Sequence, residues 1–374
     1  MSRKKQSVID PFGSTVIEDY QYLLKEFGIQ PFQPLLNKIV KPNMFMRRNV
    51  IFGHRGFDLV LEAIQKSQKF AVMSGIKPTG EFHLGNLMTA REVIYFQQHG
   101  GQAFYCIADV EAYQDNQLSL QDSHQFAVGN VADLLALGFD AKEGIIYKQS
   151  TEARVKDLAI ILSRGVTLAT LRAIYGERHL GLYLASLIQA GDILMPQLND
   201  FNGPKPTVVP VGIDQDPHLR LTRDLARKFR HYNFIAPSST YHKIMKGLDG
   251  SPKMSKRSPM SYFTLHEDNA AIQRKISHAF TGGRDTVKEQ RQLGGVPEIC
   301  PIYEICLYQF VTDDQEVVTT YHACKNGTLL CGEHKAQTIQ RVLNFIKEHK
   351  RQWRHHYDEA KAIVESTQPQ IHKQ

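Results

Sequence analysis

The sequence predicts an α/β protein: a doubly wound parallel sheet, preceded by an N-terminal extension and followed by a C-terminal all-helical domain. The sheet is indicated by short apolar runs that alternate with stretches of helical periodicity, a pattern typical of parallel strands covered by helices on both faces. The helical domain is indicated by the loss of strand-like runs from Asn269 onward. With 374 residues, the chain can hold two or three domains with a substantial core. We place the three parts at 1–68, 69–265 and 266–374.

The N-terminal extension carries few strong signals. Its expected elements, in order, are a starting segment at 9–12, a short helix over 19–28, a strand over 47–52 and a second helix over 59–64. The first helix is expected to end at Gly28, because glycine readily adopts the left-handed conformation that closes helices. The pair His54-Arg55 lies between the expected strand and the second helix.

The central domain shows the clearest alternation. Apolar runs predict buried strands over 70–75, 102–109, 144–147 and 207–212. Apolar residues at helical spacing predict helices from Leu84 onward and over 123–137, 155–162, 180–190 and 217–229. In such Rossmann-like sheets the ligand site lies at the carboxyl ends of the strands. The C-terminal domain is expected to end in one long helix over 333–365, followed by a polar tail after Ser366.

Composition narrows the class of protein. An apolar content of 42%, a charged content of 22% and no run approaching about 18 apolar residues favour a globular protein without a membrane span. The basic start, Met-Ser-Arg-Lys-Lys-Gln, lacks the apolar region of a secretion signal, so we expect a cytoplasmic protein. Five cysteines without a Cys-x-x-Cys pair indicate reduced thiols, not disulfides or a zinc knuckle. The net charge of +7 suits a polyanionic partner without proving one.

One stretch has the features of an anion site. Residues 78–86, Pro-Thr-Gly-Glu-Phe-His-Leu-Gly-Asn, connect the expected strand at 70–75 to the helix that follows. A helix start at the carboxyl end of a strand offers free N–H groups and the positive end of the helix dipole. Gly85 would let a flat ring or a phosphate approach the backbone. His83 and Asn86, three residues apart, share one helix face and could both donate to phosphate oxygens.

A second stretch supplies mobile positive charge. Residues 253–257, Lys-Met-Ser-Lys-Arg, lie in a loop marked by serine, glycine and proline. Lys253 and Lys256 could swing onto a polyphosphate and neutralise charge that develops on a leaving pyrophosphate. Taken singly, each stretch is more often an ordinary surface or core segment. Their order, spacing and contexts together favour a functional pair.

Together the two stretches resemble the His-Ile-Gly-His and Lys-Met-Ser-Lys-Ser signatures of class I aminoacyl-tRNA synthetases. Asn86 stands where the class has its last histidine, a change shared with bacterial tryptophanyl enzymes. Arg257 stands where the class has a small residue, and it could contact phosphate or tRNA or simply be solvated. The resemblance implies ATP with Mg²⁺, an amino acid and tRNA as ligands.

Longer stretches narrow the resemblance to tryptophanyl-tRNA synthetases of archaeal and eukaryotic type. Residues 211–224 resemble the segment after that family's third core strand, and residues 279–286 and 291–295 resemble its linker to the anticodon-binding helices. Three dipeptides resemble pieces of its N-terminal extension: Asp10-Pro11, Arg47-Arg48 and His54-Arg55. The resemblance spans nearly the whole chain. It implies a homodimer whose C-terminal helices bind the anticodon loop of tRNA(Trp).

The resemblance also assigns roles to residues at matching positions. The catalytic residues, which position phosphates and stabilise charge, would be His83, Asn86, Lys253 and Lys256. The ATP-binding residues would be Gly75, His83, Gly85, Asn86, Gly212, Asp214, Lys253, Met254, Ser255 and Lys256. The tryptophan-binding residues would be Met73, Cys106, Glu111, Gln189, Asp192 and Gln215. Asp214 and Gln215 could also cap a helix start.

The expected indole pocket departs from the eukaryotic members, which use a tyrosine and a glutamine for the indole N–H. The matching positions here are Met73 and Cys106, and neither side chain is a strong acceptor. Residues 189–194 instead resemble the bacterial tryptophanyl enzyme, in which an aspartate accepts the indole N–H. The matching residue is Asp192. It could otherwise form a salt bridge or a helix cap.

The sequence leaves three other interpretations of the function open. Tyrosyl-tRNA synthetases have an aspartate at the same position, but they add a tyrosine where this chain has Met73. A non-catalytic tRNA-binding paralogue could lose signature residues, whereas both signatures survive here. A small nucleotidyltransferase would lack the second signature and the helical C-terminal third. We therefore expect an enzyme that activates L-tryptophan with ATP to tryptophanyl-adenylate and transfers it to tRNA(Trp).

Overall fold

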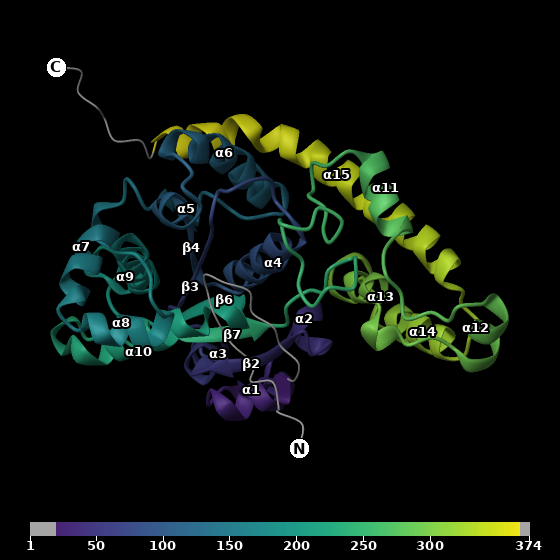
Figure 1. Ribbon diagram of the computed structural model, residues 1–374. Helices are drawn as coiled ribbons and strands as arrows, with labels where there is room; N and C mark the ends of the chain where they lie inside the picture. Colours follow the sequence, from purple (N-terminus) through teal and green to yellow (C-terminus); the bar gives the residue numbers. More distant parts are fainter. Residues whose placement is uncertain (1–19, 367–374) are drawn as a thin grey trace.

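The computed structural model describes residues 20–366, which fold around a seven-stranded sheet (Figure 1). The strand order is β1-β2-β7-β6-β3-β4-β5. The expected starting segment at 9–12 and the polar tail after Ser366 lie outside the described residues.

Most of the sheet is parallel, as the sequence predicts. The five parallel strands are β7 (Ser238–His242), β6 (Thr207–Gly212), β3 (Ala71–Ile76), β4 (Gln102–Ile107) and β5 (Ile145–Lys148). The N-terminal part adds two antiparallel strands at one edge: β1 (Gln30–Pro31) and β2 (Ile51–Arg55), of which β2 pairs with β7. The α/β class is confirmed, with an antiparallel edge added to it.

The central strands are apolar on both faces because helices cover both faces. Successive side chains of a strand point to opposite sides of the sheet. Val72 of β3 and Tyr105 of β4 accordingly belong to one apolar core, and Met73 and Phe104 belong to a second. The helices around the sheet are α3 (Phe57–Gln65), α4 (Leu84–Gln98), α5 (Asp109–Asn116), α6 (Leu120–Ala136), α7 (Ala153–Ser163), α8 (Leu168–Tyr175), α9 (Leu180–Leu194) and α10 (Asp216–Lys228). The first core lies against α3, α4 and α6, and the second against α7 to α10.

The N-terminal part corrects one prediction. The strand expected over 47–52 is wrong in position, because helix α2 (Met44–Arg47) occupies its first residue and β2 begins only at Ile51. The reason is a helix cap: the side chain of Asn43 accepts the backbone N–H of Met46 at 3.0 Å. His54 and Arg55 therefore lie inside the strand, not after it. The short helix closed by glycine is confirmed as α1 (Tyr20–Glu26).

Three central elements have no counterpart among the predicted ones. Strand β7 is polar in sequence, Ser-Ser-Thr-Tyr-His, yet all five residues are buried between β2 and β6. Helices α5 and α8 have eight residues each, and α5 also carries few apolar residues. The strand expected over 102–109 is too long, because β4 ends at Ile107 and α5 begins at Asp109.

The C-terminal part is helical, as predicted, and no strand follows β7 within residues 20–366. Its helices are α11 (Asn269–Ser277), α12 (Val287–Leu293), α13 (Pro301–Ile305), α14 (Asp314–Lys325) and α15 (Cys331–Ser366), with a π-helical turn at Cys306–Phe310. Figure 1 shows α15 in yellow, running from the outer helices back across α6. One apolar core continues from the sheet to Val342 and Ile346 of α15. The boundary predicted near residue 265 therefore crosses a continuous core.

Within residues 20–366, no single helix is both long and apolar enough to cross a membrane. Helices α7 and α8, which meet at a bend of 108°, pass that test by length and composition only when they are taken together.

Candidate active site

The first signature forms the start of α4, directly after β3. The backbone N–H of Gly85 donates to Nδ1 of His83 at 3.1 Å, and the backbone N–H of His83 donates to Oδ1 of Asn86 at 3.1 Å. These two bonds form a capping box that fixes both side chains at the helix end. Because Nδ1 is the acceptor, the ring proton is assigned to Nε2. Burial, with the nearby charges of Lys256 and Lys253, lowers the pKa of His83 to about 3, so the ring is a neutral donor at physiological pH.

The second signature reaches across to two strand ends. Lys253 Nζ donates to Oδ2 of Asp214, just beyond β6, at 3.0 Å. Lys256 Nζ donates to the hydroxyl of Thr79, just beyond β3, at 2.8 Å. The expected meeting of the two signatures is therefore present in the fold. The backbone after the lysine loop also pairs with the first signature, since Thr264 forms an antiparallel bridge with His83.

Between the signatures lies a first cavity of about 370 Å³, within the size range of small-ligand sites. Nine of the ten residues predicted to bind ATP line it: His83, Gly85, Asn86, Gly212, Asp214, Lys253, Met254, Ser255 and Lys256. The sequence analysis missed other lining residues, including Tyr262 and His242. His242 lies on the unpredicted strand β7, where its Nδ1 is 2.7 Å from Oε1 of the buried Glu92.

A second cavity of about 300 Å³ adjoins the first at the carboxyl ends of β3, β4 and β6. All six residues predicted to bind tryptophan line it: Met73, Cys106, Glu111, Gln189, Asp192 and Gln215. The two cavities share Thr89, Gly212 and Gln215, so a molecule in one can reach a molecule in the other. Gly75, the remaining predicted ATP residue, lines the second cavity instead. A Cβ at that position would clash with the carbonyl oxygen of Cys106.

Asp192 lines the second cavity and is only 1% exposed. Its Oδ2 accepts from Nε2 of Gln149 at 2.7 Å, and its Oδ1 accepts from the hydroxyl of Tyr147 at 2.9 Å. The thiol of Cys106 is a third, weaker donor to Oδ1 at 3.5 Å. Burial raises the pKa of Asp192 to about 7, although these three donors act to lower it.

Neither Tyr147 nor Gln149 was predicted as a site residue. A signal was available, because Tyr147 ends the strand predicted at 144–147 and strand ends of a doubly wound sheet form its ligand site. Gln149 follows directly after β5, and its side chain also accepts the backbone N–H of Glu111 at 3.3 Å. It thus couples the buried aspartate to the rim of the second cavity.

That rim is strongly polar. Oε1 of Glu111 lies 3.4 Å from Nζ of Lys77, which also pairs with Asp115. Nε2 of Gln189 donates to Oε1 of Gln215 at 3.3 Å. The second cavity therefore combines a buried acceptor, apolar walls and a charged rim, which is the arrangement needed to bind an amino acid by both of its ends.

Comparisons with known proteins agree with this geometry. Residues 65–347 match the family model described as tRNA synthetases class I (W and Y). The chain is 43% identical over 348 residues to the tryptophan–tRNA ligase of Aeropyrum pernix, covering 91% of this chain and 93% of that protein. It is 40% identical over 346 residues to the tryptophan–tRNA ligase of Methanocaldococcus jannaschii, again covering 91% of this chain and 93% of that protein.

Solved structures give the same result. The crystal structure of tryptophanyl-tRNA synthetase from Aeropyrum pernix superposes with a TM-score of 0.88 at 41% identity, covering 97% of this chain and 100% of that one. The enzyme from Plasmodium falciparum superposes with a TM-score of 0.81 at 25% identity. Matches of this length and identity establish membership: the chain belongs to the class I tRNA synthetases of the tryptophan and tyrosine group and, within that group, to the tryptophan–tRNA ligases.

Proposed function

We propose that this chain is a tryptophan–tRNA ligase that forms tryptophanyl-adenylate from L-tryptophan and ATP and then transfers the acyl group to tRNA(Trp). The observation that carries the proposal is the pair of adjoining cavities joined at Gly212 and Gln215. A carboxylate held in the second cavity would lie next to an α-phosphate held in the first. In that position it can attack the α-phosphorus atom with pyrophosphate as the leaving group.

The first cavity would bind ATP and stabilise the charge that moves onto pyrophosphate. His83 would donate from Nε2, and Asn86 from its side-chain amide, to phosphate oxygens at the start of α4. Lys253 and Lys256 would leave Asp214 and Thr79 and close onto the polyphosphate. Asp214, once released from Lys253, would accept from the ribose hydroxyls. Catalysis in this scheme is positioning and electrostatics, without a covalent enzyme intermediate.

Mg²⁺ is expected to enter with ATP. Asp214 is the one carboxylate among the residues that line the first cavity, and it is paired with Lys253. Mg²⁺ at nucleotide sites is commonly held by one or two carboxylates together with substrate phosphates. The cavity therefore fits an ion carried mainly by the phosphates, where it would shield their negative charge.

The second cavity would bind tryptophan, with the indole N–H donating to Asp192 and the charged rim holding the amino and carboxylate groups. Met73 and Cys106 would form the wall beside the ring, where the thiol of Cys106 is the weakest of the donors to Asp192. A buried acceptor rejects phenylalanine, because that side chain leaves the acceptor without its partner.

The remaining features of the proposal concern partners. The helices from α11 to α15 would bind the anticodon loop of the tRNA. The enzyme would act as a homodimer. It would work in the cytoplasm. In analytical ultracentrifugation at micromolar concentration, the protein should sediment as a particle with the mass of two chains. A monomer at that concentration would remove the dimer from the proposal without affecting the activation chemistry.

Amino-acid-dependent ATP–pyrophosphate exchange tests the central proposal. We expect exchange with tryptophan and none with tyrosine at equal concentration. Exchange with tyrosine alone would make the chain a tyrosyl enzyme. No exchange with either amino acid, in a folded chain that still binds tRNA, would identify a non-catalytic paralogue.

A further inference from the structure

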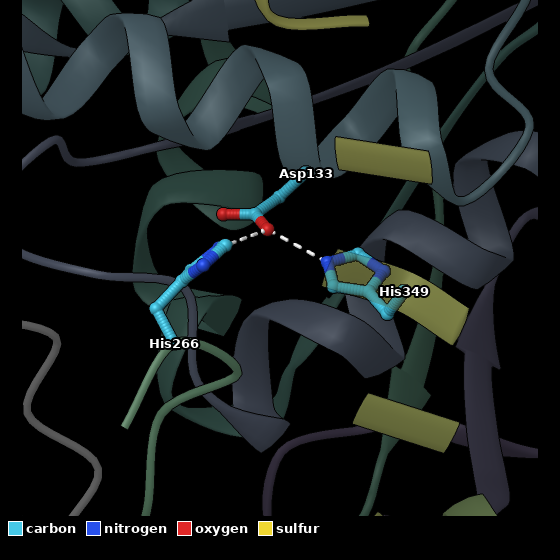
Figure 2. Close-up of side chains that lie close together, drawn as sticks. All are labelled: Asp133, His266 and His349. Atoms are coloured by element: carbon cyan, nitrogen blue, oxygen red, sulfur yellow. Dashed lines mark hydrogen bonds and ion pairs between the residues drawn. The ribbon is translucent and has the colours of Figure 1, made fainter. Parts of the chain in front are cut away.

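Three side chains from distant parts of the sequence meet outside the two cavities (Figure 2). Asp133 lies on α6, His266 lies in the segment after the lysine loop, and His349 lies on α15. Nε2 of each histidine is 2.7 Å from Oδ1 of Asp133. The proposed tRNA-charging chemistry uses none of the three.

The hydrogen bonds of this cluster are unevenly distributed. The side chains of Asp133 and His349 are each 1% exposed, and that of His266 is 18% exposed. Both imidazoles approach the same oxygen, whereas Oδ2 of Asp133 is buried without a hydrogen-bond partner. A buried carboxylate oxygen that has lost its water partners and gained no others is costly. A cation beside the carboxylate would compensate the buried charge that two hydrogen bonds to a single oxygen leave only partly satisfied.

The donor set indicates the kind of cation. One carboxylate oxygen and two imidazole nitrogens, all within 4.8 Å of one another, are ligands of first-row divalent metals. Mg²⁺ and Ca²⁺ prefer oxygen ligands throughout and do not suit two imidazoles. We propose that Asp133, His266 and His349 bind a divalent transition-metal ion of the zinc class.

To admit the ion, both imidazoles must hold their proton on Nδ1, which frees the Nε2 lone pairs, and the ligand atoms must shift to metal-site spacing. In a tetrahedral site with metal–ligand bonds of about 2.0–2.1 Å, neighbouring ligand atoms lie roughly 3.3 Å apart. The two Nε2–Oδ1 separations of 2.7 Å would therefore each lengthen by roughly half an ångström. Rotation of the Asp133 carboxylate would lengthen the separation to the buried His349, and rotation of the partly exposed His266 would lengthen its own. Its exposed side also leaves room for water as the fourth ligand.

The ion would have a structural role, because its three ligands come from α6, from the segment after the lysine loop and from α15. Next to the cluster, Nε1 of Trp353 donates to the carbonyl of Gly129 at 3.0 Å, which joins α15 to α6. Nζ of Lys350 donates to the carbonyl of Glu267 at 2.9 Å, which joins α15 to the segment after the lysine loop. That segment also pairs with the first signature through Thr264 and His83. The ion would thus hold α15 and the end of the lysine loop against the sheet domain.

The test uses the untagged full-length chain, stripped of metal with a chelator and then titrated with Co²⁺ or Zn²⁺. We expect visible d–d absorption of imidazole-bound Co²⁺ that saturates at one ion per chain, and a melting temperature that rises by a few degrees with Zn²⁺. His349→Gln and His266→Gln should lose the absorption and the thermal shift. His355→Gln, an exposed histidine nearby on α15, is the matched control and should keep both.

Absence of the Co²⁺ absorption in the wild-type chain, or equal absorption in His349→Gln, would overturn the proposal and leave a hydrogen-bonded cluster only. Far-UV circular dichroism of each metal-free variant checks its folding. If His349→Gln fails to fold, His266→Gln decides alone, because its partly exposed side chain tolerates replacement better. Both readouts are independent of the charging reaction, so they do not depend on the proposed function.

Discussion

The two cavities hold their polar groups in opposite ways. In the first cavity, the lysines rest on partners in half-exposed pairs, such as Lys253 with Asp214, whose side chains are 37% and 19% exposed. In the second cavity, Asp192 is fully buried and accepts hydrogen bonds from three fixed donors. Half-exposed pairs are weak and exchange partners readily, whereas buried charged networks are rigid and costly to disturb. The first arrangement suits charge that must move with a leaving group, and the second suits recognition of one side chain.

Lys256→Ala should produce the largest change if the lysines of the first cavity act in the transition state. Removing one donor to developing charge typically lowers kcat by about 10²–10³-fold. We expect a loss of that size in kcat for pyrophosphate exchange, with little change in tryptophan affinity measured by calorimetry. Arg257→Ala, which removes a neighbouring positive charge, is the matched control and should lower kcat far less. Equal losses in kcat and in tryptophan binding would contradict a transition-state role.

Asp192→Asn should come next, because it alters the fixed network of the second cavity. A hydrogen bond to a charged group contributes about 1.5–3 kcal/mol, which corresponds to a loss of roughly 10–100-fold in kcat/KM for tryptophan. The loss should appear mainly in KM, with ATP binding unchanged. Asp200→Asn, an exposed aspartate that pairs with Arg154, is the control for removal of an acidic charge. An unchanged KM for tryptophan would mean that the indole N–H donates to a group other than Asp192.

Local signals in the sequence indicate the catalytic residues of the first cavity but not the hydrogen-bond network around Asp192 in the second, and the reason is physical. The four predicted catalytic residues of the first cavity lie in two short contiguous stretches, where glycine, lysine and a helix start are local signals, whereas lining residues such as Gly212 and His242 come from other strands. The network of the second cavity joins Cys106 of β4, Tyr147 and Gln149 at the end of β5, and Asp192 of α9, and only the fold brings these three parts of the chain together. Met73 and Cys106 could be placed there only by resemblance. Strand β7 stayed hidden because its residues are polar and become buried through neighbours that the sequence does not indicate.

The cluster of Asp133, His266 and His349 marks the limit of sequence interpretation. Metal sites are recognised from sequence when their ligands repeat at short spacing, as in Cys-x-x-Cys pairs. Here each ligand comes from a different segment, and two of the three lie on long helices with ordinary helical periodicity. Their meeting depends on α15 crossing α6, a packing arrangement that no local pattern specifies.

The pH dependence of KM for tryptophan should report on the second cavity alone, because Asp192 lies there. Asp192, with a pKa of about 7, accepts the indole N–H best when it is ionised, so KM for tryptophan should fall several-fold as the pH rises from about 6 to about 8. The stability effect has the opposite sign. Because the folded-state pKa lies above the unfolded value of about 3.9, folding stability is lost as the pH rises between these values. Asp192→Asn should remove both dependences, and a KM profile that persists in the variant would assign it to another group.

Thr79→Val should have the smallest effect, and it tests the comparison most directly when it is paired with Tyr147→Phe. Each substitution deletes one hydroxyl with a similar hydrogen bond: Thr79 to Lys256 at 2.8 Å and Tyr147 to Asp192 at 2.9 Å. If the lysine pair is only a resting position, Thr79→Val changes kcat by less than about 3-fold, because exposed partners contribute little. Tyr147→Phe should raise KM for tryptophan by about 10-fold, because it removes a donor from a buried carboxylate. Losses of equal size in the two variants would mean that both cavities are equally rigid, and the division between mobile charge and fixed recognition would then be wrong.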